Sequence, residues 1–373
     1  MTHRIIILHG YSSKNRGDGL LVEESVSLIR EALGEDTRIT LLASDPDSFA
    51  HLSVDRYCSR PGRRGWDSGY LRELRHLNSY DLVVGVGGGY LRAGTVTEAL
   101  KTALVHIPQL GAAALSRTPA VYLPQSIGPL RGGTRLAYAP LLRRLTTLML
   151  RDDRSVTELS LPDAVRTPDL AITSPEFTDR FASDAADGTG EAESVLTVRA
   201  VHGAVPPLVT TLADALAAAD VPVTGYIQSS VGGNSDSDAQ RSVTPGPLLD
   251  EDAYLRKNSH HADPRRVVVA VRLHAALLAL RAGHRVIHLS YERKGFSAFA
   301  DLGLEEWVHN VNDFDPALVV DQVHALREST EEQHRYDGLV RDRVPYLVGQ
   351  HDLAVNSLRE AVGSDAPAER TAQ

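Results

Sequence analysis

Two arginines and one histidine are the residues whose types and spacing most directly suggest chemistry. Arg199 ends the apolar run 195–199, and Arg272 ends the apolar run 267–272. If both runs are strands of one parallel sheet, the two guanidinium groups lie at the same edge and could hold a small dianion or a carboxylate. His274 follows Arg272 by two residues, so the two side chains share a face only if the chain is still extended there.

Each of these residues also has a purely structural interpretation. A buried charge is costly unless it is paired, so Arg272 could instead form an ion pair with a residue of its own domain. His274 could cap a helix or lie hydrogen-bonded in the interior. Both interpretations stay open on the sequence alone.

Three loops in the first half carry polar groups or glycines directly after predicted strands. The loop 10–19 contains Asn15 and Asp18, and Asp18 is well placed to cap the following helix or to bind a ligand. The glycine run 87–89, which includes Gly88 and Gly89, would let the backbone approach a ligand, although it lacks the G-x-G-x-x-G spacing. In Pro124-Gln-Ser-Ile-Gly-Pro129, Gln125 and Ser126 could hydrogen-bond a polyhydroxylated substrate or close the turn.

Several enzyme classes lack their motifs in this sequence. The neighbouring His260 and His261 do not form the i, i+4 pair of a zinc helix, so we expect no metal site. Neither a G-x-S-x-G nucleophile turn nor a phosphate-binding P-loop is present. These patterns argue against a metalloprotease, a serine-triad hydrolase and a kinase.

Composition indicates a globular protein with more than one domain. The chain has 373 residues, of which 42% are hydrophobic and 23% charged. Its net charge of −9 argues against nonspecific nucleic-acid binding, which needs a cationic face. A single cysteine, Cys58, excludes an intramolecular disulfide, and we expect neither a signal peptide nor a transmembrane segment. We therefore expect a cytoplasmic protein.

The chain repeats one pattern in two halves, in which short apolar runs alternate with amphipathic segments. We predict strands at 5–8, 82–86, 120–123 and 148–150, and again at 195–198, 223–227, 267–271 and 285–289. Helices are predicted at 20–33, 208–219 and 350–363. Asp152 should begin a helix as its cap. Residues 175–193 look like a linker and 229–247 like a long structureless insert.

This pattern predicts an α/β fold with two doubly wound, Rossmann-like domains facing a cleft. We place the first domain at 1–178 as the probable acceptor side and the second at 194–345 as the donor side. Residues 346–373 should form a C-terminal helix that packs back on the first domain, followed by a frayed tail. In such sheets ligands bind beyond the carboxyl ends of the strands.

The ordered loops resemble those of the polysaccharide pyruvyl transferase family. The similarity is carried by six short motifs over residues 5 to about 310. They are Asn15-Arg-Gly-Asp18, Gly87-Gly-Gly-Tyr-Leu91, Pro124-Gln-Ser-Ile-Gly-Pro129, Arg151-Asp-Asp-Arg-Ser155, Arg272-Leu-His-Ala275, and Ser290-Tyr-Glu-Arg-Lys-Gly-Phe296 followed by Leu302-Gly-Leu304.

The resemblance implies a glycosyltransferase-B-like fold and transfer of pyruvate from phosphoenolpyruvate to a sugar-containing acceptor as a ketal. By the same resemblance, Arg272 and Leu273 belong to the element that contacts phosphoenolpyruvate, His274 is the proposed general acid, and Arg199 has a donor-binding role. The chemistry requires no cofactor beyond this co-substrate. A lipid-linked acceptor at the membrane surface is compatible with it. The run Tyr90-Leu-Arg-Ala-Gly94 departs from the family pattern and leaves the acceptor sugar open.

Two other functions stay open on the sequence. A nucleotide-sugar glycosyltransferase of the same architecture would use Arg272 to bind a diphosphate. A non-catalytic relative would only bind a glycan or a phosphorylated ligand.

Overall fold

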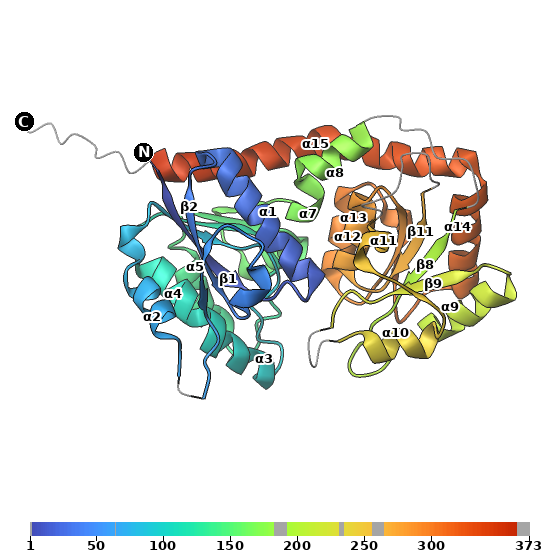
Figure 1. Ribbon diagram of the computed structural model, residues 1–373, viewed down its shortest axis with the longest axis horizontal. Helices are drawn as coiled ribbons and strands as arrows, with labels where there is room; N and C mark the ends of the chain where they lie inside the picture. Colours follow the sequence, from blue (N-terminus) through green and yellow to red (C-terminus); the bar gives the residue numbers. More distant parts are fainter. Residues whose placement is uncertain (1, 64, 183–191, 231–234, 256–264, 364–373) are drawn as a thin grey trace, which may run out of the picture. The chain divides into compact units, whose positions relative to one another are not determined.

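The computed structural model describes residues 2–63, 65–182, 192–230, 235–255 and 265–363 (Figure 1). The chain divides into two compact units. Unit 1 comprises residues 1–13, 18–170 and 349–373, and unit 2 comprises residues 14–17 and 171–348. Each unit is built on one parallel sheet flanked by helices, as Figure 1 shows.

The sheet of unit 1 has seven parallel strands in the order β3-β2-β1-β4-β5-β6-β7. Ile5 of the central strand lies opposite Ile39 on one side and Leu82 on the other. The strands are β1 (Arg4–Gly10), β2 (Arg38–Ala43), β3 (Asp55–Cys58), β4 (Leu82–Gly85), β5 (Ala120–Gln125), β6 (Thr147–Leu150) and β7 (Ala164–Arg166).

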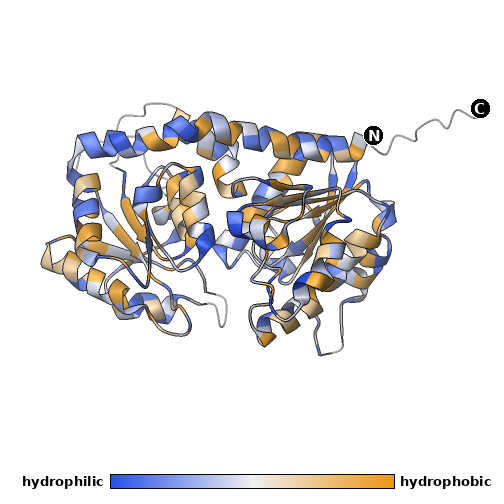
Figure 2. Cartoon of the chain, turned by 180° about the vertical axis from the view of Figure 1, so that it is seen from behind, coloured by the Kyte–Doolittle hydropathy of each residue, from blue (hydrophilic) through white to orange (hydrophobic). Residues whose placement is uncertain are grey.

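Alternate residues of the central strand pack into two cores, one on each face of the sheet. Ile5 and Ile7 belong to one buried cluster, and Ile6 and Leu8 to the other. A strand that is buried on both faces must be apolar at every position, which explains the continuous run of aliphatic residues in β1. Figure 2 shows the same pattern in the hydrophobic colour of the strands.

The helices of unit 1 cover both faces of this sheet. They are α1 (Arg16–Leu33), α2 (Ser68–Arg75), α3 (Val96–Lys101), the π-helix η3 (Thr102–His106), α4 (Ile107–Leu115), α5 (Thr134–Leu142) and α6 (Asp153–Leu159), with short 3₁₀ turns η1 (Pro46–Phe49) and η2 (Leu77–Ser79). Asp152 caps α6 as predicted, because its side chain accepts a hydrogen bond from the Ser155 amide at 2.9 Å.

Unit 2 repeats the strand order of unit 1 with six strands. The order is β10-β9-β8-β11-β12-β13, so the first strand in sequence lies beside the fourth, as β1 lies beside β4 in unit 1. This 3-2-1-4-5-6 arrangement is that of the Rossmann fold. The strands are β8 (Ser194–Thr197), β9 (Val223–Tyr226), β10 (Leu248–Leu249), β11 (Val267–Ala270), β12 (Arg285–Ser290) and β13 (Val308–Asn310).

The remaining helices pack mainly on the sheet of unit 2. They are α7 (Leu170–Thr173), α8 (Pro175–Ala182), α9 (Pro207–Ala218), α10 (Ser237–Val243), α11 (Glu251–Tyr254), α12 (Leu273–Arg281), α13 (Arg293–Asp301), the 3₁₀ turn η5 (Glu305–Trp307), α14 (Pro316–Glu328) and α15 (Thr330–Gly363). Helix α12 is buried at nearly every position between Leu273 and Leu280, which fits its apolar sequence.

Helix α15 begins earlier than predicted, at Thr330 instead of residue 350. Its first part clusters with unit 2, and its last part, from Gly349 on, clusters with unit 1. There Val355 and Leu358 join the core, and His351 bonds Glu31 of α1 at 2.9 Å. The final residues 364–373, expected to be frayed, lie outside the described residues.

Two segments predicted to lack regular structure contain helices. In the predicted linker 175–193, residues 175–182 form α8, and residues 183–191 lie outside the described part. Helix α8 clusters with unit 2, so unit 1 ends its main segment at Leu170 and not at residue 178. The cause is packing on α12, where Glu176 pairs with Arg281. In the insert 229–247, residues 237–243 form α10.

All eight predicted strands are present, with ends shifted by a few residues. The short edge strands β3, β7 and β10 have partly exposed residues and no strong apolar signal, which is why the sequence did not predict them. None of the helices among the described residues is long and apolar enough to cross a membrane.

Candidate functional site

The loops after the two central strands of each sheet lie where such folds bind ligands. In unit 2, β8 and β11 are neighbours, and the order of the strands reverses between them. Ligands of doubly wound sheets bind at the carboxyl ends of the strands on either side of this point. Arg199 follows β8 and Arg272 follows β11, so both predicted donor-binding arginines lie at the expected place in unit 2.

Arg272 is held by a buried carboxylate that the sequence did not single out. Its Nε and Nη2 atoms donate to the two oxygens of Asp236 at 2.5 and 2.7 Å. Asp236 is 2% exposed and Arg272 is 8% exposed, so the ion pair lies in the interior of unit 2. Burial raises the pKa of Asp236, while the charges of Arg272 and Arg199 oppose that rise. Asp236 is therefore under the influence of both arginines.

Arg199 is oriented by an aromatic residue of the Ser290–Phe296 motif. Its Nη1 donates to the hydroxyl oxygen of Tyr291 at 2.5 Å, and its guanidinium carbon lies 4.8 Å from the centre of the Tyr291 ring. Its Nε donates to the carbonyl of Ala200 at 3.1 Å. Cation–π contact and hydrogen bonding together hold this guanidinium at the end of β8.

The helix start at Leu273 sends Arg272 and His274 to different neighbours. Arg272 is the N-cap of α12 and still has extended backbone (φ −86°, ψ 131°), but Leu273 and His274 are already helical. The condition that the chain stays extended through His274 is therefore not met. Arg272 turns to Asp236, whereas the His274 ring lies against the backbone of Gly17. Leu273 is 5% exposed and packs in the core of unit 2.

The segment 14–17 clusters with unit 2 and contributes to this site. Asn15 forms a β-bridge with Ser229, whose carbonyl accepts from the amide of Asp236 at 2.9 Å. A Cβ atom added at Gly17 would lie 2.4 Å from Cγ and Nδ1 of His274, so only glycine fits there without a shift of the ring. Asn15 was grouped with the acceptor loops, yet in the structure it lies beside the segment that carries Asp236.

Asp18 does not cap the helix as predicted. Helix α1 begins at Arg16, which places Asp18 inside its first turn and makes the residue before Arg16 the flanking one. A carboxylate in the first turn still interacts favourably with the helix dipole. Asp18 belongs to unit 1, unlike Asn15.

In unit 1, the glycine loop and the loop after β5 form one hydrogen-bonded layer. The amide of Ser126 donates to the carbonyl of Gly88 at 2.7 Å, and Gly88 forms a parallel bridge with Gln125. A Cβ atom at Gly89 would lie 3.8 Å from the Ser126 Cβ atom. The structure thus brings together Gly88, Gly89, Gln125 and Ser126, as their positions after β4 and β5 predicted.

A buried ion pair fixes this layer from below. Arg151, at the end of β6, donates from Nε to the Ser126 hydroxyl oxygen at 3.0 Å and pairs with Asp169 through Nη1. Both partners are buried, with 3% of Arg151 and 2% of Asp169 exposed. Removing either partner would leave a charge buried alone, so this pair positions Ser126 firmly.

A cluster of histidine and tyrosine side chains in unit 1 was missed by the sequence reasoning. His9 Nε2 lies 2.9 Å from the Tyr122 hydroxyl, and His106 Nδ1 lies 3.3 Å from His9 Nδ1. Tyr90 stacks on both histidine rings, with centroid distances of 4.4 and 4.9 Å. His9 has a left-handed backbone (φ 70°), which is rare for a residue other than glycine.

Burial keeps both histidines neutral. It lowers the pKa of His9, helped by His106, and it lowers the pKa of His106 to about 3, helped by Lys101. His106 ends the π-helix η3, a feature that often marks functional sites. The available signal was the position of His9 at the carboxyl end of the first predicted strand.

The predicted residues thus form two groups, one in each unit. Arg199, Arg272, Leu273, His274 and Asn15 lie in unit 2, and Asp18, Gly88, Gly89, Gln125 and Ser126 lie in unit 1. Among the described residues, no group of three or more histidine, cysteine, aspartate or glutamate side chains is arranged to hold a metal ion.

Known structures share the fold of the chain at low sequence identity. A UDP-GlcNAc 2-epimerase from Neisseria meningitidis is similar with a TM-score of 0.57 and 11% identity, covering 96% of this chain and 100% of its own. A putative UDP-N-acetylglucosamine 2-epimerase from Listeria monocytogenes gives 0.56 and 11%, covering 98% and 96%.

A UDP-glucosyltransferase from Polygonum tinctorium gives a TM-score of 0.54 and 13% identity, covering 97% of this chain and 98% of its own. These similarities support the fold alone. They confirm the predicted glycosyltransferase-B-like pair of Rossmann-like domains. Among curated proteins, none matches this sequence.

The family model of polysaccharide pyruvyl transferases matches residues 15–217. This span exceeds half of the chain and includes four of the six motifs on which the resemblance was based. The chain therefore belongs to the polysaccharide pyruvyl transferase family, and it is a transferase.

Proposed function

We propose that the protein transfers the pyruvate unit of phosphoenolpyruvate to hydroxyl groups of a sugar-containing acceptor, forming a ketal and releasing phosphate. Family membership supports a pyruvyl transferase with such an acceptor. The donor, the ketal product and a cytoplasmic location, which the single Cys58 favours, are part of the proposal.

The observation that carries the proposal is the convergence of Arg199 and Arg272 on one buried carboxylate. Asp236 shows that a carboxylate fits against Arg272 in bidentate geometry, with the charge of Arg199 close enough to influence it. A guanidinium group has five N–H donors, and Asp236 accepts from two of its nitrogens. Arg199 and Arg272 would together bind the carboxylate and the phosphate of the donor.

In the proposed reaction, His274 donates a proton to the methylene carbon of phosphoenolpyruvate. Positive character then develops at the second carbon, and one acceptor hydroxyl attacks it and loses its proton. A second hydroxyl attacks the same carbon, the bond to the phosphate oxygen breaks, and inorganic phosphate leaves. The arginines contribute positioning and electrostatic stabilisation while charge moves within the donor.

On the acceptor side, we propose that the layer of Gly88, Gly89, Gln125 and Ser126 contacts the sugar. Its backbone groups and the Ser126 hydroxyl suit hydrogen bonding to a polyhydroxylated molecule. Arg151 and Asp169 would keep this layer in place. The reaction requires no cofactor beyond the donor.

Ligand-induced stabilisation tests the identity of the donor. A ligand that binds only the folded protein raises its apparent stability by mass action. We expect phosphoenolpyruvate to stabilise the wild type and to lose this effect in Arg272→Ala, while Arg281→Ala at the far end of α12 keeps it. Stabilisation by nucleotide sugars but not by phosphoenolpyruvate would instead support a glycosyltransferase.

Turnover tests the reaction itself. The protein is incubated with phosphoenolpyruvate and a panel of sugar-containing acceptors, and phosphate release and acceptor mass are measured. We expect phosphate release together with a mass gain of one pyruvylidene group on one acceptor. Donor binding without phosphate release on any acceptor would point to a non-catalytic binding protein.

A further inference from the structure

A second group of arginines lies at the opposite end of the unit 2 strands. Arg265 precedes β11, and Arg285 is the first residue of β12, so both lie at the amino edge of the sheet. Arg180 approaches from α8. Arg199 and Arg272 follow the carboxyl ends of the strands, so the amino-edge group is separate from the proposed donor site.

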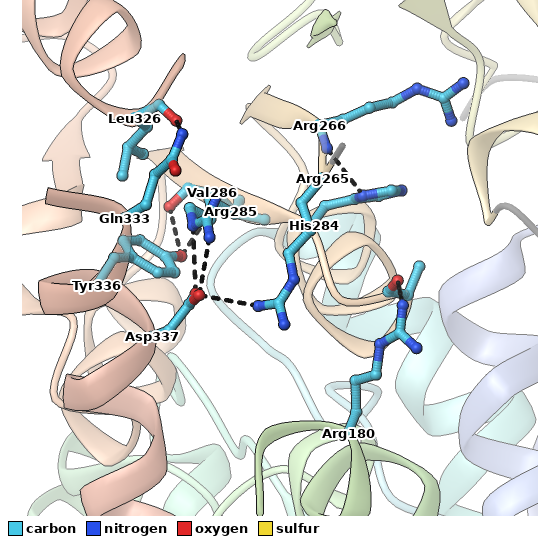
Figure 3. Close-up of polar contacts among 11 residues, drawn as sticks. Arg180, Arg265, Arg266, His284, Arg285, Val286, Leu326, Gln333, Tyr336 and Asp337 are labelled. Carbon is cyan, nitrogen blue, oxygen red and sulfur yellow. Dashed lines mark hydrogen bonds and ion pairs between the residues drawn. The ribbon is translucent and has the colours of Figure 1, made fainter. Parts of the chain in front are cut away.

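One carboxylate is shared by two of these guanidinium groups. Asp337 of α15 accepts from Arg265 Nη1 at 3.0 Å and from Arg285 Nη2 at 2.8 Å through the same oxygen (Figure 3). Arg285 is 2% exposed, and Arg265 and Asp337 are 9% and 8% exposed. Two buried positive charges thus divide the charge of Asp337 between them.

Arg180 adds a third guanidinium group, which is bound by backbone. Its Nη2 donates to the carbonyl of Ala282 at 3.2 Å, as Figure 3 shows. In the described part of the chain, no carboxylate lies within ion-pair distance of Arg180, and its buried Nε makes no hydrogen bond there. Arg180 therefore lacks a described counter-charge, in contrast to Arg281, which pairs with Glu176 between the same two helices.

Gly283 allows this close approach. A Cβ atom at this position would lie 2.3 Å from Arg180 Nε and 3.0 Å from its Cζ, so a side chain would displace the guanidinium. The backbone of Gly283 is left-handed (φ 84°), which glycine adopts at little cost. The turn between α12 and β12 is thus shaped to receive Arg180.

The position of Arg180 is electrostatically unfavourable as it stands. Burial lowers the pKa of the Arg180 guanidinium, and the positive charge of Arg265 lowers it further. Like charges at short range in a partly desolvated site repel each other unless an anion lies between them. An anion that receives hydrogen bonds from both groups would remove this repulsion.

We propose that Arg180 and Arg265 form a binding site for a small multivalent oxyanion, of which inorganic phosphate is the simplest member. Guanidinium groups suit such a ligand because their N–H donors match pairs of phosphate oxygens. Arg285 and Asp337 hold Arg265 in place behind the site. This site does not depend on the proposed catalytic reaction.

Calorimetric titration with inorganic phosphate at low salt tests the proposal. The full chain is compared with Arg180→Gln, with Arg180→Lys, and with Arg281→Gln as the matched control. We expect Arg180→Gln to weaken phosphate binding about tenfold or more, and Arg180→Lys to weaken it less because it keeps the charge but loses the paired donors. Arg281→Gln should bind like the wild type.

A further variant separates this site from the donor site, which would also bind phosphate. Phosphate binding that survives in Arg272→Gln and disappears in Arg180→Gln supports the amino-edge site. The proposal is overturned if phosphate does not bind the wild type, or if binding is lost in Arg272→Gln and kept in Arg180→Gln.

Unfolding measurements keep the test valid if affinity is weak. Without phosphate, Arg180→Gln should be at least as stable as the wild type, because the substitution removes a like-charge repulsion. With phosphate, the wild type should gain more stability than the variant. Equal gains in both proteins would contradict the proposal.

Discussion

Arg272 and Asp236 form a two-pronged ion pair in the interior of unit 2, with N–O distances of 2.5 and 2.7 Å. The partners are 36 residues apart in sequence and come from the residue that caps α12 and the residue that precedes α10. The pair joins a proposed donor-binding arginine to a segment that looked structureless in the sequence. It makes Arg272 a structural residue as well as a candidate ligand-binding one.

Breaking this pair should destabilise the protein. Arg272→Ala leaves the Asp236 carboxylate buried without its main partner, and we expect a loss of about 3–5 kcal/mol in the free energy of unfolding. The double variant Arg272→Ala/Asp236→Ala should recover part of this loss, because no charge is then stranded. Urea unfolding of the two single variants and the double variant measures the effect. A single variant as stable as the wild type would show that the pair contributes nothing.

His274→Ala should lower turnover while leaving the donor bound. A histidine that acts as a general acid contributes about 10²–10⁴ in rate, so we expect a decrease of that order. Affinity for phosphoenolpyruvate should change little, since Arg199 and Arg272 remain. The measurement is phosphate release at saturating donor, with the exposed His334→Ala as control. Wild-type turnover in His274→Ala would remove this residue from the mechanism.

Gly17→Ala should disturb the same histidine from the other side. The new methyl group would lie 2.4 Å from the His274 ring, so the ring must move. A misplacement of about 1 Å can cost about 10²-fold in rate, and we expect a fall in turnover of that order with donor affinity retained. Gly111→Ala, where the added methyl meets nothing within 4 Å, is the matched control and should leave turnover unchanged. If both variants turn over alike, contact with Gly17 does not position His274.

The buried histidines of unit 1 should make stability depend on pH. The pKa of His106 is about 3 in the folded protein, whereas the ordinary value is 6.5, so below pH 6.5 the unfolded chain binds a proton that the folded chain does not. Stability is thus fully present above pH 6.5 and is lost as the pH falls toward 3. The loss should reach about 1.4 kcal/mol per pH unit for each such histidine.

Denaturant unfolding between pH 7 and pH 5 checks this expectation. His106→Gln should show a shallower loss of stability with falling pH than the wild type. His334→Gln replaces an exposed histidine and should follow the wild type. Parallel curves for all three proteins would mean that His106 is not held neutral by burial.

The sequence by itself determined the fold class and the places where chemistry could occur. Strands such as β1 and β11 are apolar at every position because both faces are buried, and this pattern is visible in one stretch of chain. Residues just after such strands, including Arg199, Arg272, Gln125 and Ser126, could therefore be assigned to the carboxyl edges of the sheets. These are local properties, and local sequence suffices for them.

Only the tertiary structure decided what these residues contact. Asp236 binds Arg272, His106 reaches His9 across 97 residues, and Arg180 approaches Gly283. Each contact depends on which loops the strand order brings together and on where a helix starts, as at Leu273. A polar residue in a loop has no periodic pattern that reveals its partner, because pairing energy arises only when the fold has placed both groups in the same buried space.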